Sequence, residues 1–195
     1  VLGAPACLKT LLDRGISFYE AGERLWGKPV VGIGVAGREG KEGSTLLEIE
    51  RFFAVYQMKN QLSRIVYGAL PGEVLLPEEN RDVARQLAKA LFGEAAEKRE
   101  TSCRLCGGET FRFLGGDRVR CMLCSATGTV TMRNNRPAID IDAEEHQFLM
   151  GKEEAYEHRD SLNNSRERFE AQKIRLKEVV TGYADEGTWI KPERN

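Results

Sequence analysis

The sequence predicts an α/β protein with a parallel sheet, followed by a small metal-binding ribbon and a long helix. Helix and strand patterns alternate through the first part of the chain, which is typical of a parallel sheet covered by helices. Four cysteines then stand in two Cys-x-x-Cys pairs, and the last part is highly charged with one narrow apolar row. We therefore expect three regions, at residues 1–97, 101–142 and 143–195.

The first region is expected to begin with a helix, a strand and a second helix. Pro5 suits the first turn of a helix with leucines at helical spacing. The apolar, β-branched run at 29–35 is typical of a strand buried on both faces. Thr45 and Glu48 are expected to form a capping box for a helix that carries its apolar face through residue 56.

A second strand is expected at 62–67, followed by a helix that Pro77 opens and Gly93 ends. Two strands are too few for a parallel sheet to stand alone. We therefore expect further strands either upstream of Val1 or from a partner.

The two cysteine pairs, Cys103 with Cys106 and Cys121 with Cys124, predict a metal site. Fourteen residues separate the pairs, and four thiolates brought together by a short hairpin form a tetrahedral shell around one ion. We expect zinc, with iron in a rubredoxin-like site as the alternative that the ligands alone leave open. The remaining cysteine, Cys7, is expected to be a small buried residue.

Two hairpins are expected around this site, one at 111–121 and one at 127–141. Arginines are frequent between 101 and 136, with Phe111 and Phe113 among them, as in some small nucleic-acid readers. The same arginines can offset the negative charge of four thiolates on one dication, and the whole chain is slightly acidic. We therefore expect a structural ribbon and no nucleic-acid partner.

The composition excludes a membrane-spanning class. The chain has 195 residues, 41% of them hydrophobic and 30% charged, with a formal net charge of −1. No apolar run approaches the roughly 20 residues that a spanning helix needs, and no signal-peptide pattern is present. We expect a cytoplasmic protein, since paired thiols at metal spacing suit a reducing compartment.

Four segments resemble the C-terminal half of the flavodoxin-like NADPH-dependent FMN reductase family. They are 3–14, the strand 30–35, the glycine-rich loop 37–45 and the helix 46–53, and the resemblance covers about the first 93 residues. In that family a five-stranded parallel sheet lies between helices. The resemblance implies a partial flavodoxin-like three-layer fold, truncated at its N-terminus.

The resemblance also implies FMN binding and hydride transfer from NAD(P)H to an electron acceptor, in a homo-oligomer. It assigns the flavin-facing positions to two loops, formed by Gly3 and Ala4 and by Gly37, Arg38, Glu39, Gly40, Glu42 and Gly43. The family's phosphate-binding loop has no counterpart here, so we expect this chain to bind FMN weakly or not at all. From the pattern alone, the second loop also fits a solvated turn.

The sequence contains no recognisable nucleophile motif and no Gly-Lys-Ser/Thr phosphate loop. We therefore expect an FMN-dependent NAD(P)H oxidoreductase in which the cofactor carries the reaction and no side chain is catalytic. The alternative is a non-enzymatic zinc-ribbon adaptor that binds protein or nucleic acid.

The C-terminal region is expected to be a helix with an apolar residue at every seventh position. These residues are Leu162, Phe169, Leu176 and Tyr183. The positions between them are mostly polar, which argues against a sustained coiled coil. We expect this helix to lie across the α/β region or across a second subunit.

Overall fold

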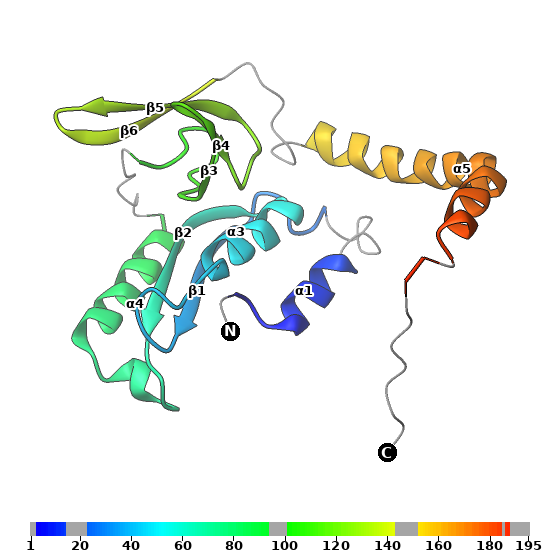
Figure 1. Cartoon of the computed structure of the whole chain (residues 1–195). Coiled ribbons are helices and arrows are strands. Elements are labelled where there is room, and N and C mark those ends of the chain that lie inside the picture. The colour runs from blue at the N-terminus through cyan, green and yellow to red at the C-terminus, as the bar shows by residue number, and fades with distance from the viewer. Residues whose placement is uncertain (1–2, 15–22, 94–100, 143–151, 185, 188–195) are drawn as a thin grey trace. The chain divides into compact units, whose positions relative to one another are not determined.

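The computed structural model describes residues 3–14, 23–93, 101–142, 152–184 and 186–187 (Figure 1). Its internal contacts divide the chain into two compact units, residues 1–155 and 156–195. The first unit contains a two-stranded parallel sheet with helices and a four-stranded antiparallel sheet. The second contains most of a long helix, so the predicted mixed α/β architecture with a C-terminal helix is confirmed.

The parallel sheet consists of β1 (Pro29–Ala36) and β2 (Lys59–Tyr67), connected through α3 (Thr45–Val55). Two glycines of β1 let α3 pack closely against one face of this sheet. A Cβ atom at Gly32 would lie 2.7 Å from Ile49 of α3, and one at Gly34 would lie 3.0 Å from Thr45. The glycines in the apolar run therefore serve helix packing, which fixes where α3 begins relative to the end of β1.

The other face of the sheet is covered by α4 (Glu78–Leu91), which follows the short 3-10 helix η2 (Glu73–Leu75). Leu62 of β2 packs in a small core with Leu87 and Ala90 of α4. Pro77 precedes the first turn and Gly93 follows the last with φ of 100°, as predicted for both ends. The sheet is thus sandwiched between helices, as the three-layer prediction requires.

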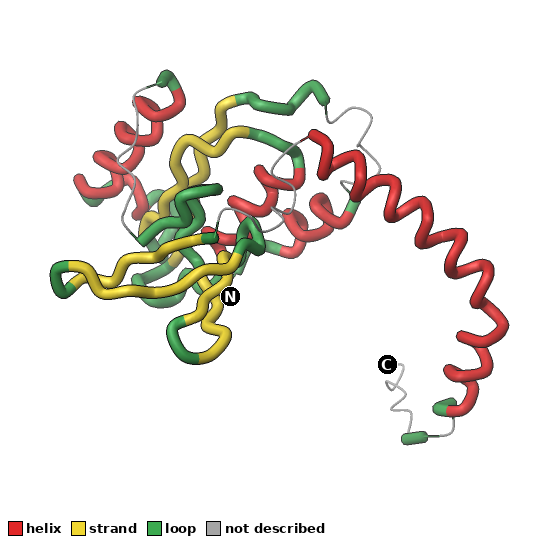
Figure 2. The backbone as a smooth tube through the Cα atoms, turned by 90° about the horizontal axis from the view of Figure 1, so that it is seen from above, coloured by secondary structure: helices red, strands yellow, loops and turns green. Residues whose placement is uncertain are grey.

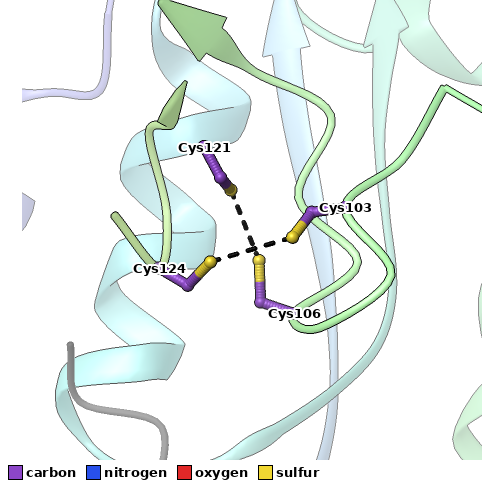
Figure 3. Close-up of side chains that lie close together, drawn as sticks. All are labelled: Cys103, Cys106, Cys121 and Cys124. Atoms are coloured by element: carbon purple, nitrogen blue, oxygen red, sulfur yellow. Dashed lines mark hydrogen bonds between the residues drawn. The ribbon is translucent and has the colours of Figure 1, made fainter. Parts of the chain in front are cut away.

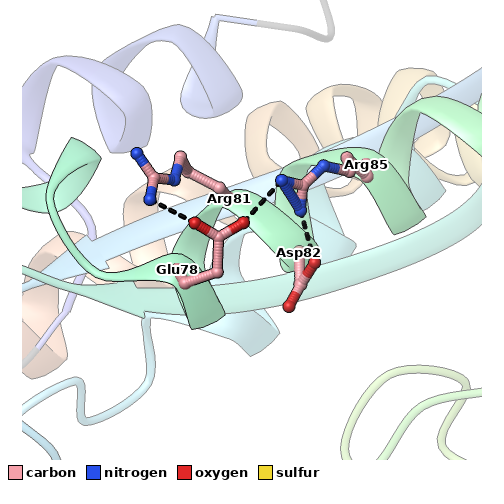
Figure 4. Close-up of polar contacts among 4 residues, drawn as sticks. All are labelled: Glu78, Arg81, Asp82 and Arg85. Atoms are coloured by element: carbon pink, nitrogen blue, oxygen red, sulfur yellow. Dashed lines mark hydrogen bonds and ion pairs between the residues drawn. The ribbon is translucent and has the colours of Figure 1, made fainter.

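The outward face of α4 carries a network of exposed charges (Figure 4). Glu78 pairs with Arg81 and with Arg85, whose Nη2 lies 2.6 Å from the Glu78 carboxylate, and Arg85 also pairs with Asp82. Exposed pairs of this kind contribute little stability. We interpret them as a solvated helix face.

The antiparallel sheet has the strand order β3–β4–β5–β6. Its strands are β3 (Phe111–Gly115), β4 (Arg118–Cys121), β5 (Thr127–Arg133) and β6 (Arg136–Ile141). Asn134 and Asn135 both have positive φ in the β5–β6 turn, which suits a two-residue hairpin. Both predicted hairpins are therefore present, and β4 pairs with β5 to join them into one sheet.

Three local expectations are wrong. The strand β1, expected to be buried on both faces, has Ile33 51% exposed and Val35 57% exposed. Thr45 is the first residue of α3 rather than its cap, and its hydroxyl donates to the carbonyl of Glu42 at 2.6 Å. Ser44 instead donates to the Glu48 carboxylate at 2.7 Å, so the predicted capping box does not form. Cys7 is exposed, because α1 (Ala6–Asp13) has no buried residue.

The C-terminal helix α5 (Lys152–Gly182) runs unbroken for 31 residues (Figure 2). Among the residues that the structure describes, no helix combines the length and the apolar character that crossing a membrane demands.

Candidate metal centre and flavin-facing loops

The four predicted cysteines converge on one point (Figure 3). Cys103 and Cys106 precede β3, Cys121 is the last residue of β4, and Cys124 follows it. Their sulfur atoms all lie within 4.8 Å of one another. Cys103 Sγ lies 3.7 Å from Cys124 Sγ, and Cys106 Sγ lies 3.5 Å from Cys121 Sγ. A tetrahedron of sulfurs around zinc has edges of about 3.8 Å, given Zn–S bonds of about 2.3 Å. The cluster therefore has the size that one tetrahedral ion requires.

Two turns with the same hydrogen bonds carry these cysteines. In the first turn, residues 103–108, Gly107 N donates to Cys103 O at 2.7 Å and Cys103 N donates to Gly108 O at 2.8 Å. In the second turn, residues 121–126, Ser125 N donates to Cys121 O at 3.0 Å and Cys121 N donates to Ala126 O at 2.9 Å. Each turn therefore directs both of its thiols to the same side.

The site is closed. Cys103, Cys121 and Cys124 have no exposed surface, and they form a core with Ala126 and Ile141. Gly108 N lies 3.4 Å from Cys106 Sγ, as expected for a backbone amide that stabilises a thiolate. A closed sulfur shell of this kind is typical of structural metal sites.

The electrostatics of the free thiols also favour a cation. Hydrogen bonds with Cys106, Cys121 and Cys124 hold the pKa of the Cys103 thiol far below its usual range. Hydrogen bonds with the same group of thiols raise the pKa of Cys106 far above it. The crowded sulfurs therefore cannot all ionise at once, and a bound dication would allow all four to become thiolates.

The helix α3 contacts the second turn. The Arg51 guanidinium donates to the Met122 carbonyl, with Nη2 at 2.9 Å and Nε at 3.3 Å. Glu50, only 6% exposed, has its pKa raised to about 7, mainly by burial and further by the nearby charges of Glu109 and Cys121. These contacts attach the ribbon to the helix that follows the glycine-rich loop.

The glycine-rich loop lies directly after β1. Gly37, Arg38, Glu39 and Gly40 are exposed, Gly40 and Gly43 have positive φ, and Glu42 is half-buried. The loop ends where α3 begins, which is the edge of the sheet at which open α/β folds bind ligands.

The structure brings Gly3 and Ala4, the other loop that the resemblance assigned to flavin contacts, to the same helix end. Ala4 N donates to Glu48 Oε2 at 2.5 Å, and a Cβ atom at Gly3 would lie 3.1 Å from Glu48 Oε1. Hydrogen bonds from Ser44 and Ala4, together with Lys9, outweigh the effect of burial and lower the pKa of Glu48. The ionised Glu48 side chain therefore holds this turn in place.

Sequence reasoning missed two residues here, Glu48 as the anchor of the turn and Tyr67 beside the loop. Burial is the main cause that raises the pKa of Tyr67, and the carboxylates of Glu42 and Glu39 raise it further, partly through a hydrogen bond with Glu42. Glu42 Oε2 is buried and has no hydrogen-bond partner among the described residues. The position of Tyr67 at the carboxyl end of the second strand was the signal that could have found it.

A buried acceptor without a partner fits a site for a ligand that donates a hydrogen bond. The imide N–H of a flavin ring is such a donor. By contrast, the backbone amides of Ala69 and Leu70, which follow β2, both donate to Glu73 Oε2, at 2.6 and 2.7 Å. This pair of amides is therefore already satisfied and does not offer a phosphate site.

Comparison with known proteins supports the fold. No protein-family model matches the chain, and no curated protein matches its sequence. A solved structure described as a flavone reductase superposes with a TM-score of 0.63 at 17% sequence identity, over 98% of this chain and 75% of that one. The chain thus shares the fold of that protein.

Proposed function

We propose that this chain carries the flavin-facing part of an FMN-dependent NAD(P)H oxidoreductase, stabilised by a zinc ion at the four cysteines. The observation that carries the proposal is the meeting of the two loops at the N-terminus of α3. Glu48 binds Ala4 of one loop, and the other loop runs directly into the same helix. Two segments that the family resemblance assigns to flavin contacts therefore converge, although more than thirty residues separate them. The shared fold with a protein named as a reductase is in keeping with this.

The residues of the two loops would hold the ring of FMN. Their glycines allow backbone amides to approach a flat ring, and Glu42 Oε2 would accept its imide hydrogen, with the position of Glu42 maintained by Tyr67. FMN would supply the hydride chemistry that no side chain here provides. Since the amides of Ala69 and Leu70 are bonded to Glu73, we expect weak binding of FMN by this chain.

The test is a titration of FMN monitored by fluorescence quenching and by equilibrium dialysis. We expect saturable binding that Glu42→Leu weakens about tenfold, the effect of losing one buried hydrogen bond of about 1.4 kcal/mol. Glu79→Leu, the same change at an exposed position of α4 outside the two loops, serves as the matched control. If Glu42→Leu bound FMN as tightly as the native chain does, the proposed hydrogen bond between the flavin ring and Glu42 would be rejected.

Activity is tested with NADH and NADPH by absorbance at 340 nm, with FMN added in excess. A flavone is the first acceptor to try, because the solved structure with this fold is named for reduction of flavones. An increase in NAD(P)H oxidation that needs both FMN and the chain would support the proposal.

Zinc is proposed because the shell of sulfurs is closed and offers no open position for chemistry. Elemental analysis of purified protein tests this directly. Iron in place of zinc would give a coloured, redox-active protein and would place the four cysteines in the electron path.

A non-enzymatic adaptor is the second candidate, and the exposed side chains of the β3–β4 hairpin favour it. Arg112 and Arg120 are exposed and lie opposite each other across the two strands, and Phe113 is 68% exposed. Basic and aromatic side chains on one hairpin can bind single-stranded nucleic acid. Binding of an oligonucleotide that Arg112→Gln/Arg120→Gln abolishes, without any binding of FMN, would favour this candidate.

A further inference from the structure

The helix α5 exposes a row of apolar side chains on the second unit. Its members occur at every seventh residue, and Val179, three residues after Leu176, extends the row near its end. Phe169 is 49% exposed, Leu176 is 42% exposed and Tyr183 is 64% exposed. Helices in proteins gain most of their stability from packing an apolar face against another element. The row therefore has the character of a contact surface.

Positively charged side chains lie on both sides of this row. In a helix with a seven-residue repeat, the residues four after and one before each apolar position flank the seam. Between Leu162 and Leu176, these flanking positions hold Arg166 and Lys173 on one side and Arg168 and Arg175 on the other, all exposed. Arg159, also exposed, continues the first of these flanks toward the start of the helix.

The contacts within the helix agree with this placement. Lys173 Nζ lies 5.9 Å from the centre of the Phe169 ring, so this flanking cation is beside the apolar row. The acidic residues Asp160 and Glu167 occupy a position that faces away from the seam in the same repeat. Two of these cations also pair with acids of α5, because Lys173 Nζ lies 3.1 Å from Glu170 Oε2 and Arg159 Nη2 lies 2.8 Å from Asp160 Oδ1. The exposed arginines of α4 pair with acids one turn away in the same manner (Figure 4).

The helix dipole does not explain this arrangement. Cations would be favoured in the last turn of a helix, and the last turn of α5 contains none. The cations instead follow the apolar row through the middle of the helix.

We infer that α5 binds an acidic amphipathic helix from another polypeptide, with carboxylates on both sides of an apolar row. Pairing with a second copy would bring cations against cations, because flanking positions face flanking positions in parallel and in antiparallel helix pairs alike. A membrane surface fits less well, because Ser165 and Gln172 interrupt the apolar face that an interfacial helix buries. A homo-oligomer, if formed, would use another surface.

The experiment uses the full chain and two synthetic helical peptides of four heptads, with leucine at the core positions. One peptide has glutamate at every flanking position, and the other has lysine. Isothermal titration calorimetry at low salt should show that the glutamate peptide binds at least tenfold more tightly. Raising the salt concentration should reduce this preference, since the flanking charges are exposed.

Charge reversal at the flanks provides the sharper test. The double variant R166E/K173E should lose the preference for the glutamate peptide and gain affinity for the lysine peptide. E167Q/E178Q, with two changes at exposed outward positions, serves as the control and should behave like the native chain. Circular dichroism checks that the variants retain their helix content.

Several results would overturn the inference. Equal binding of the two peptides would do so, as would a dimer in sedimentation analysis that Phe169→Asp dissociates. Binding to phosphatidylserine vesicles or to duplex DNA, in the absence of binding to the glutamate peptide, would point to a different partner and would equally reject it. None of these outcomes depends on whether the chain binds FMN.

Discussion

The two cysteine turns have the same backbone hydrogen bonds but different residues and different neighbours. The first turn ends in Gly107 and Gly108, and the second ends in Ser125 and Ala126. Gly107 and Ser125 occupy equivalent positions and both have positive φ, at 77° and 65°. The second turn also receives Arg51 from α3. The turn is therefore defined by its backbone conformation, which glycine adopts in the first turn and serine in the second.

The largest effect should come from removing a ligand, and it should be the same in both turns. We expect Cys103→Ser and Cys121→Ser each to reduce the metal content from about one ion per chain to nearly none, because three thiolates do not complete the shell. The loss should unfold the antiparallel sheet, since a structural zinc ion contributes on the order of 10 kcal/mol. Elemental analysis and circular dichroism measure both effects.

Cys7→Ser is the matched control for these two variants, because Cys7 is exposed and far from the cluster in sequence. Retention of a stoichiometric metal ion by either ligand variant would show that the two turns do not share one site.

The second largest effect should come from adding a methyl group beside the sulfurs. It should weaken metal binding in the first turn, whereas the second turn already contains such a group. A Cβ atom at Gly108 would lie 3.1 Å from Leu123 Cβ and 3.3 Å from the sulfurs of Cys106 and Cys121. We expect Gly108→Ala to weaken metal binding about tenfold, because the thiolates must move by a few tenths of an ångström. Ala126 occupies the position of the second turn that corresponds to Gly108. Its methyl group is fully buried there, so the second turn has room for it.

A competition assay with a coloured zinc chelator measures this difference. Ala126→Gly should leave metal affinity nearly unchanged and lower the free energy of unfolding by about 1 kcal/mol. Equal affinities for the native chain and Gly108→Ala would mean that the first turn has more room than the structure gives it.

The cysteine turns could be predicted from the sequence because they depend on local spacing. The contacts of the loops around α3 could not, because they join residues that are far apart in the sequence. Pairs of cysteines two residues apart predict convergent thiols wherever a hairpin joins them. The role of Glu48 depends on a contact with Ala4, which is 44 residues away in the sequence. The expected capping box failed for a related reason, because Glu48 is occupied by Ser44 and by that distant amide. The local sequence pattern predicted the helix α3, but it could not predict that the Glu48 carboxylate accepts a hydrogen bond from Ala4 N.

The third prediction tests the contact that only the second turn makes. Arg51→Met removes two hydrogen bonds to the Met122 carbonyl and should cost about 1 kcal/mol, because the guanidinium is exposed. Hydrogen exchange should become faster at residues 121–126 and stay unchanged at 103–108. Arg51→Lys, which retains a donor, should have a smaller effect. Faster exchange in both turns would show that α3 supports the whole ribbon rather than one turn.

The smallest effect concerns the conformation that both turns share. A residue with a side chain is disfavoured at positive φ by about 1 kcal/mol, and Ser125 has this conformation. Ser125→Gly should therefore stabilise the protein, by less than about 1 kcal/mol because glycine also increases the entropy of the unfolded chain. Gly107→Ser should destabilise it by a similar amount, although a Cβ atom there would meet nothing within 4 Å. Urea unfolding at constant metal concentration measures both changes, and opposite signs are expected. If both variants were destabilised, the Ser125 side chain itself would have to stabilise the second turn, and the two turns would not be equivalent in energy despite their common hydrogen bonds.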